Sequence, residues 1–325
     1  MKRQPTHQPN RWSPKEYERV WPTRQAIADQ LDANLQAFSA NQCALPGIAD
    51  PAARATLVRQ MIASLRRLDY SHIIRTRDIS PDRVDPQSQL FDPERAAVLH
   101  FRAGRLDEAF WLVFLITHFG KSLKHGWRML RDVYSGLGAG TWTWARVSAN
   151  PAAFRASLLA NQGHIGGGFG SHRKRESIRA DLPGGTAAVV ESYVAWVGPA
   201  HSHAALMAGL TQAGGNSPES IFDHCYNSMT VTRFGRLGKF DYLCLLRRLG
   251  FADLAPGSAY LVGATGPLAG ARLLFGGRTD ARLRATRLED LLRDLDAVLD
   301  VGMQVMEDSL CNWQKSPRHF VHFRG

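Results

Sequence analysis

Two glycines three residues apart stand among basic residues in the most informative run of this sequence. In chain order the run contains Arg233, Gly235, Arg236, Gly238 and Lys239, and an apolar segment follows that ends at a glycine, residue 250. In a helix-hairpin-helix element, such glycines let the turn close tightly and leave backbone N–H groups directed outward at a helix N-terminus, where a DNA phosphate can bind. The run therefore predicts a phosphate-binding hairpin that does not read the bases.

Three acidic residues near the basic segments are candidates for the chemistry. Asp241 lies in the first turn of the helix that we expect after the hairpin, where the helix dipole stabilises a negative charge. Glu176 is the single acid in the run from 172 to 176, and Asp253 is the next acid after the hairpin helix. A carboxylate can stabilise a cationic transition state or position a water molecule. We predict Asp241 as the catalytic acid, with Glu176 and Asp253 as alternatives, although an acid among cations is usually a salt-bridge partner.

The positive charge of the chain is concentrated in two segments. The 325 residues contain 40 Lys and Arg against 29 Asp and Glu, a formal net charge of +11. Residues 118–178 contain nine basic and two acidic side chains, and residues 231–278 contain seven and two. Solvated helix faces explain most single cations, but the two segments together indicate a footprint for a phosphate backbone. The residues that we expect to contact DNA are Lys121, Arg128, Arg173, Lys174, Arg233, Gly235, Arg236, Gly238 and Lys239.

Aromatic side chains lie within the first basic segment. They include Trp142, Trp144 and Phe169, and His172 follows closely. Proteins hold an unstacked base against aromatic rings between phosphate-binding cations, so these four residues are a candidate base pocket. Taken singly, each aromatic residue is more often part of the core.

The elements that must position these residues are helical, because strand-like alternation is almost absent. Apolar residues recur at helical spacing over residues 24–40, 52–67, 95–100 and 107–119. A serine followed by a proline predicts a further helix start at Ser13. Clustered glycines predict a break at 136–140 and a loop at 163–170. The predicted fold class is all-α.

The last long element carries one apolar stripe. Apolar residues at three- and four-residue steps run from Leu288 to Leu310. Thr286 and Glu289 have the spacing of a capping box. We therefore predict one helix of about six turns that begins there.

A proline-rich stretch suggests how the chain divides into domains. Residues 79–93 contain three prolines and several aspartates, which predicts a loop. We place a boundary there, so that residues 1–92 form an N-terminal helical region with a basic arm and residues 93–325 form the catalytic region.

Several classes of protein are disfavoured by the sequence. The four cysteines, at positions 43, 225, 244 and 311, have no metal or redox spacing, and His201, His203 and His224 lack neighbouring carboxylates at ligand spacing. We therefore predict no metal and no cofactor. The N-terminus lacks a secretory signal and the longest apolar run is too short to cross a bilayer. We predict a cytoplasmic protein with no membrane partner and no obligate protein partner.

Several runs resemble the alpha-glutamyl/putrescinyl thymine pyrophosphorylase family, which is related to helix-hairpin-helix DNA glycosylases. Besides the hairpin, the resemblance rests on residues 107–111 (DEAFW), 117–121 (THFGK), 142–146 (WTWAR), 169–174 (FGSHRK), 263–276 (GATGPLAGARLLFG) and 310–315 (LCNWQK). It extends from about residue 95 to the end of the chain.

The resemblance implies a two-lobed, all-helical protein that grips duplex DNA with the hairpin and acts on one extruded pyrimidine. Two chemistries follow from it: displacement of pyrophosphate from a modified uracil by an amine, or excision of an altered base. The glycosylases place an aspartate after the hairpin helix, but residues 263–267 here contain no acid. Phe240 stands where glycosylases that also cut the strand have a lysine, which disfavours Schiff-base chemistry. The closely spaced cysteines of an iron–sulfur cluster are missing as well.

The sequence therefore predicts a monofunctional DNA glycosylase that flips out and excises a modified pyrimidine from double-stranded, phage-type DNA and leaves an abasic site. Such an activity would serve antiviral defence. The alternative is a transferase that displaces pyrophosphate from a modified thymine or uracil with an amine. A third hypothesis is a helical DNA-binding module without catalysis.

Overall fold

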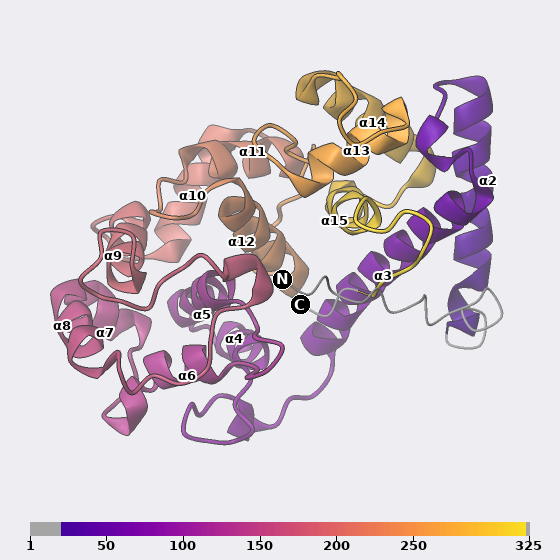
Figure 1. Cartoon of the computed structure of the whole chain (residues 1–325). Helices are drawn as coiled ribbons and strands as arrows, with labels where there is room; N and C mark the ends of the chain where they lie inside the picture. Colours follow the sequence, from indigo (N-terminus) through magenta and orange to yellow (C-terminus); the bar gives the residue numbers. More distant parts are fainter. Residues whose placement is uncertain (1–20, 323–325) are drawn as a thin grey trace, which may run out of the picture. The chain divides into compact units, whose positions relative to one another are not determined.

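The computed structural model describes residues 21–322, which fold entirely into helices and connecting loops (Figure 1). The α-helices are α2 (Gln25–Asn41), α3 (Pro51–Thr76), α4 (Pro93–Arg102), α5 (Leu106–Phe119), α6 (Arg128–Tyr134), α7 (Trp144–Ala149), α8 (Pro151–Asn161), α9 (Thr186–Val197), α10 (His203–Gly214), α11 (Pro218–Ser228), α12 (Arg236–Leu249), α13 (Gly266–Gly276), α14 (Ala285–Leu299) and α15 (Met303–Trp313). The all-α prediction is confirmed for these residues, as are the four helical stretches and the two glycine-rich interruptions. The helix start expected at Ser13 lies outside the described residues.

The described chain forms two compact units. Unit 1 comprises residues 21–69 and 256–322, and unit 2 comprises residues 70–255. The loop at 79–93, where the composition suggested a domain boundary, lies inside unit 2. The N-terminal helices instead share a core with the C-terminal helices.

The core of unit 1 joins α2 and α3 to α13, α14 and α15. Trp313 of α15 is fully buried, and its indole N–H donates a hydrogen bond to the carbonyl oxygen of Ala53 at 3.0 Å. Gly270 lets α13 lie directly against α15, because a Cβ at this position would stand 2.3 Å from the carbonyl oxygen of Leu310. Side chains from both ends of the sequence therefore stabilise one core.

The C-terminal stripe belongs to two helices, so the prediction of a single helix is wrong. The chain breaks between α14 and α15, where Asp300 and Gly302 have φ values of 51° and 85°. The carboxylate of Asp296 accepts hydrogen bonds from the N–H groups of Val301 and Gly302 at 3.1 and 2.9 Å. The stripe stays continuous because both helices turn an apolar face to the same core.

The capping box predicted for this element is also wrong. Helix α14 begins after Arg284 and has no side-chain cap. Glu289 instead accepts a hydrogen bond from the N–H of Leu261 at 2.6 Å, so its carboxylate is used in a long-range contact.

Helix α5 is the centre of unit 2. All residues from Ala109 to Phe119 are buried, and α4, α6, α7, α10 and α12 pack around the helix. It ends at Gly120, whose φ of 62° reverses the chain at little cost only because the residue has no Cβ. A helix that is apolar on every side requires this central position.

A buried chain of hydrogen bonds links α12 to α5 through α9 and α10. The hydroxyl groups of Tyr242 and Tyr193 are 3.0 Å apart, and the hydroxyl of Tyr193 is 2.7 Å from Nε2 of His203. Nδ1 of His203 is 2.9 Å from the carboxylate of Asp107. Burial lowers the pKa of His203 and raises the pKa of both tyrosines, while the hydrogen bond from His203 lowers the pKa of Asp107.

These protonation states fix the direction of every bond. Because Asp107 is ionised, the neutral His203 donates from Nδ1, and its Nε2 accepts from Tyr193. Tyr193 has then used its only proton, so Tyr242 must be the donor to Tyr193. The chain runs from α12 to the start of α5 with each proton assigned.

We expect Tyr193→Phe to destabilise the protein more than Tyr242→Phe. Loss of the middle hydroxyl leaves both a buried donor and a buried acceptor unpaired, at a cost of about 2–4 kcal/mol, whereas loss of the terminal donor costs about 1 kcal/mol. Chemical denaturation of the two matched variants measures both values. Equal losses would show that the assigned direction is wrong.

Candidate nucleic-acid interface and catalytic acid

The run predicted to form the hairpin, residues 233–239, covers the end of the loop between α11 and α12 and the first turn of α12 in unit 2. Helix α12 begins after Gly235 and ends at Gly250, as predicted, with a left-handed φ of 74° at Gly250. No side-chain hydrogen bond caps α12 at Gly235. The N–H groups of its first turn have no partner within the helix and carry the positive end of the helix dipole.

The two glycines of the hairpin serve different needs. Gly238 lies in the first turn of α12, where a Cβ would stand 3.0 Å from the ring of Phe234, so this glycine allows the start of the helix to pack on Phe234. A Cβ at Gly235 would meet no atom within 4 Å. Gly235 is therefore not required by packing within the protein, and the missing side chain leaves the backbone at the start of α12 open to an external group.

The basic run at residues 171–177 lies directly against the hairpin. Nη2 of Arg173 donates to the carboxylate of Asp241 at 2.9 Å. Asp241 is the sixth residue of α12, so the prediction that it lies in the first turn is wrong, and Arg173 rather than the start of the helix stabilises its charge. Arg233 makes two contacts with the same run: its Nε binds the carboxylate of Glu176 at 3.1 Å and its Nη2 binds the carbonyl oxygen of Arg175 at 3.0 Å. Parts of the two basic segments, residues 173–176 and 233–241, thus meet in unit 2, whereas Arg272 and Arg278 of the second segment belong to unit 1.

Asp241 and Arg173 differ in exposure, and this difference defines their roles. The Arg173 side chain is only 7% exposed, whereas that of Asp241 is 37% exposed. The guanidinium also lies 5.8 Å from the centre of the Phe234 ring. Arg173 was expected at a DNA phosphate, but its guanidinium is turned inward and holds Asp241 at the surface. Lys174, next in sequence, is exposed.

Two glycines bring the end of α5 against this region. The N–H of Gly170 donates to the carbonyl oxygen of Phe119 at 2.8 Å. A Cβ at Gly170 would stand 2.9 Å from the backbone of Gly120, and one at Gly120 would stand 3.4 Å from Cγ of Arg173. The glycine-rich loop therefore serves a close backbone contact that positions Arg173.

His118 lies beneath this contact as a neutral buried base. Its Nε2 is 3.0 Å from the hydroxyl of Thr186, which donates its own proton to the carbonyl oxygen of Ser177. The hydroxyl must therefore accept, so His118 carries its proton on Nε2. Burial, followed by the charges of Arg173 and Arg233, lowers the pKa of His118 to about 3.

The other two candidate acids lie in different surroundings. Glu176 is 11% exposed and paired with Arg233, as expected of a salt-bridge partner. Asp253 is exposed and lies beyond the C-terminal end of α12, whose length from Asp241 to Leu249 is about 12 Å. Asp241 and Glu176 therefore lie near the converging segments, and Asp253 does not.

A fourth acid, Glu94, was missed by the sequence analysis. Burial raises the pKa of Glu94, and the nearby charges of Arg248 and Lys121 oppose that shift. Nε of Arg248 is buried and has no hydrogen-bond partner among the described atoms. In the sequence Glu94 follows Asp92, which caps α4, so it looks like an ordinary first-turn acid. Glu94 differs from such an acid because Arg248 of α12 lies close enough for its charge to act on the buried carboxyl group.

The four residues of the candidate base pocket differ in how exposed they are. Trp142 and Trp144 are core residues, 5% and 3% exposed, and the indole N–H of Trp144 binds the carbonyl oxygen of His201 at 2.7 Å. Phe169 is half-buried and stacks on Phe119 with ring centres 5.6 Å apart. His172 is exposed. Phe169 thus lies against the end of α5, and His172 belongs to the exposed part of the basic run. Both tryptophans pack inside unit 2.

The remaining expected DNA contacts lie at the surface of unit 2. Lys121 is exposed, with its ammonium 5.8 Å from the centre of the Trp127 ring. Arg128 is 56% exposed and lies 3.6 Å from the carboxylate of Asp132. Lys239 is half-buried over the ring of Tyr226, and burial lowers its pKa. Arg236 lies over the ring of Phe240, 5.1 Å from its centre.

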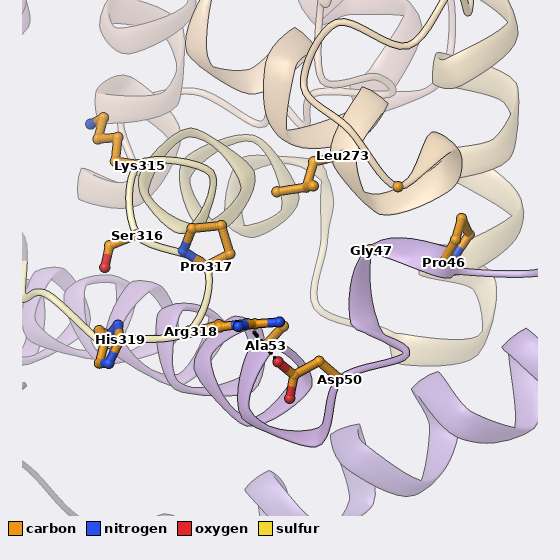
Figure 2. A pocket seen from close by; sticks show the side chains of 11 residues that line it. Pro46, Gly47, Asp50, Ala53, Leu273, Lys315, Ser316, Pro317, Arg318 and His319 are labelled. Carbon is orange, nitrogen blue, oxygen red and sulfur yellow. Dashed lines mark ion pairs between the residues drawn. The ribbon is translucent and has the colours of Figure 1, made fainter.

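A hollow of about 540 Å³ lies elsewhere, within unit 1, and none of the predicted site residues lines it. Figure 2 shows Arg318 turned toward Asp50, and these two form an ion pair at 2.7 Å. Lys315 donates to Asn312 at 3.1 Å. Because these charges stabilise the unit itself, we assign no site to this hollow.

The histidines considered as metal ligands have other roles or surroundings. His203 belongs to the hydrogen-bond chain with Asp107, and the carbonyl oxygen of His201 accepts from Trp144. Among residues 21–322 no cluster of three metal-ligating side chains is present. In the same range no helix is both long and apolar enough to span a membrane.

The fold and the site define an all-helical protein with a fixed, partly exposed carboxylate beside a cationic hairpin. A family model described as alpha-glutamyl/putrescinyl thymine pyrophosphorylase clade 3 matches residues 52–325, so the chain belongs to this family. The match confirms the resemblance and extends it toward the N-terminus. Comparisons with curated proteins and with solved structures gave no match.

We expect His118→Gln to change how stability depends on pH. Below about pH 6.5 the unfolded chain protonates His118 and the native protein does not, so the free energy of unfolding falls by about 1.4 kcal/mol per pH unit until about pH 3. Glutamine keeps a donor toward Thr186 but does not titrate. The stability difference between the wild type and the variant should therefore shrink or reverse as the pH falls from 6.5 to 4. Parallel unfolding curves over that range would contradict the buried neutral histidine.

Proposed function

We propose that this protein is a DNA-modifying transferase that acts on a thymine carrying pyrophosphate in double-stranded DNA and replaces the pyrophosphate with an amine. The family description, which names a thymine pyrophosphorylase, favours this chemistry over base excision. The observation that carries the proposal is the carboxylate of Asp241, fixed by the buried Arg173 at 2.9 Å and 37% exposed beside the hairpin.

The reaction needs a base, a cationic environment and an accessible target. The amine nitrogen forms a bond to the carbon that carries the pyrophosphate, and the carbon–oxygen bond breaks with its electron pair on the departing pyrophosphate. The amine loses one proton, which Asp241 accepts. Cations near the hairpin stabilise the negative charge that develops on the leaving group.

The hairpin and the basic run bind the duplex in this proposal. The uncapped start of α12 receives a phosphate close to Gly235, where no side chain interferes. Surface cations contact neighbouring phosphates, and they are Lys121, Lys174, Arg128, Arg236 and Lys239. Phe169 and His172 are the candidates for contact with the extruded base. Arg173 acts through Asp241 and is a positioning residue.

A DNA glycosylase is the second candidate, because the same carboxylate could stabilise an oxocarbenium-like transition state at the sugar. In that case the base would leave and an abasic site would remain. The proposal has three further parts, which rest on the sequence. The family is related to helix-hairpin-helix glycosylases, the protein acts in the cytoplasm, and it serves in defence against phages with modified DNA.

The product formed from a modified duplex tests the proposed reaction. With a duplex that carries a pyrophosphorylated thymine and an amine donor, we expect release of pyrophosphate and a nucleoside heavier by the amine, measured by mass spectrometry after digestion. Asp241→Asn should lower the rate on the order of 10²–10⁴-fold, because the general base is lost. Asp294→Asn, an exposed acid on α14, is the matched control.

Each alternative outcome has a distinct signature. Heat- or amine-labile abasic sites would identify the glycosylase instead. DNA binding with neither product would support the non-catalytic module. Full activity in Asp241→Asn, with loss in Glu176→Gln, Asp253→Asn or Glu94→Gln, would move the catalytic role to that acid. Thermal melting of each variant ensures that rates are compared between folded proteins, because Arg173 loses its counter-charge in Asp241→Asn.

The dependence of DNA affinity on salt concentration tests the proposed interface. We expect Lys174→Gln and Lys239→Gln each to lower the slope of log affinity against log salt concentration by about 1, because each lysine neutralises one phosphate. Arg293→Gln, on an exposed face of α14, should leave the slope unchanged. Fluorescence anisotropy on an unmodified duplex measures this slope. An equal effect of all three variants would mean that the two basic segments do not form the interface.

A further inference from the structure

The loop that follows α5 presents one apolar side chain among cations. Residues 121–126 reverse tightly, and the chain returns through two backbone hydrogen bonds between Ser122 and Gly126, at 3.0 and 2.8 Å. Leu123 lies at the tip and is 67% exposed, the highest value among the large apolar residues of the described chain. The side chain of Leu123 is therefore accessible from outside the protein.

Three hydrogen bonds hold the loop together, and its side chains are strongly basic. The hydroxyl of Ser122 accepts a hydrogen bond from the N–H of His125 at 3.3 Å, which adds to the two backbone bonds. Lys121 and Lys124 are exposed on either side of Leu123, and Lys121 lies over the ring of Trp127. A membrane or a protein partner would require a wider apolar surface around Leu123, whereas a polyanion suits its charged neighbours.

The loop also begins at the proposed site. Gly120 contacts Gly170 and the side chain of Arg173, which holds Asp241. Leu123 is three positions after Gly120, so their Cα atoms are at most about 11 Å apart. The tip therefore lies near any duplex whose target base is presented to Asp241.

We propose that Leu123 inserts into the base stack of duplex DNA and fills the gap that the extruded thymine leaves. Apolar side chains inserted between base steps unstack them and kink the duplex, and a base must leave the stack before a protein can reach its atoms. Lys121 and Lys124 hold the phosphates on both sides of the gap. The inference rests on the proposed function, because it requires the duplex as the partner.

The test uses the full-length protein and a duplex with 2-aminopurine at the position of the target base, whose fluorescence rises when it leaves the stack. We expect the wild type to raise this fluorescence and Leu123→Ala to lose most of the rise, with unchanged salt dependence of binding. Leu123→Phe should retain the rise. Leu159→Ala, a half-exposed leucine on α8, is the matched control.

Activity provides a second and separate readout. On a fully paired modified duplex, Leu123→Ala should react about 10- to 100-fold more slowly, and a bulged, already unpaired target should restore the rate, because the cost of unstacking has been removed. Unstacking that depends on Leu123 without any chemistry would support the wedge and reject the proposed reaction. Normal unstacking and normal rates in Leu123→Ala would reject the wedge alone. Failure of the wild type to bind duplex DNA would reject both.

Discussion

Arg173 is a cation inside unit 2, and a buried guanidinium is stable only where a counter-charge meets it. That counter-charge is Asp241, which lies in the second turn of α12. The pair therefore fixes the start of α12 against the loop at 171–177, and Arg233 repeats the connection through Glu176. The structure around the candidate site depends on this constraint, since it joins residues 173–176 to residues 233–241, which are far apart in the sequence.

The residue after Asp241 anchors the same helix from its inner side. Tyr242 begins the hydrogen-bond chain that passes through Tyr193 and His203 to Asp107 at the start of α5. Helix α12 thus has one charged residue held at the surface and its neighbour held in the core. A carboxylate fixed in this way loses little freedom when a substrate binds, which is the geometric requirement of efficient catalysis.

The sequence predicted what local physics determines. Helical spacing indicated the all-α class, and the glycines at 235 and 250 marked the start and the end of α12, because these signals depend on a few neighbouring residues. Pairing of Arg173 with Asp241 joins residues 68 positions apart, and no pattern along the chain reports such a contact. For the same reason Glu94 resembled an ordinary first-turn acid, and the break at Asp300 was hidden by an apolar stripe that two helices share. The tryptophans were ambiguous because burial and base stacking require the same side chains.

The most direct test of this arrangement is a crystal structure of the protein bound to a duplex that carries a modified thymine. We expect a phosphate at the N-terminus of α12 within about 3 Å of its backbone N–H groups, and the extruded base within about 3.5 Å of the Asp241 carboxylate. A duplex bound elsewhere, with Asp241 facing only solvent and Arg173, would contradict the central claim.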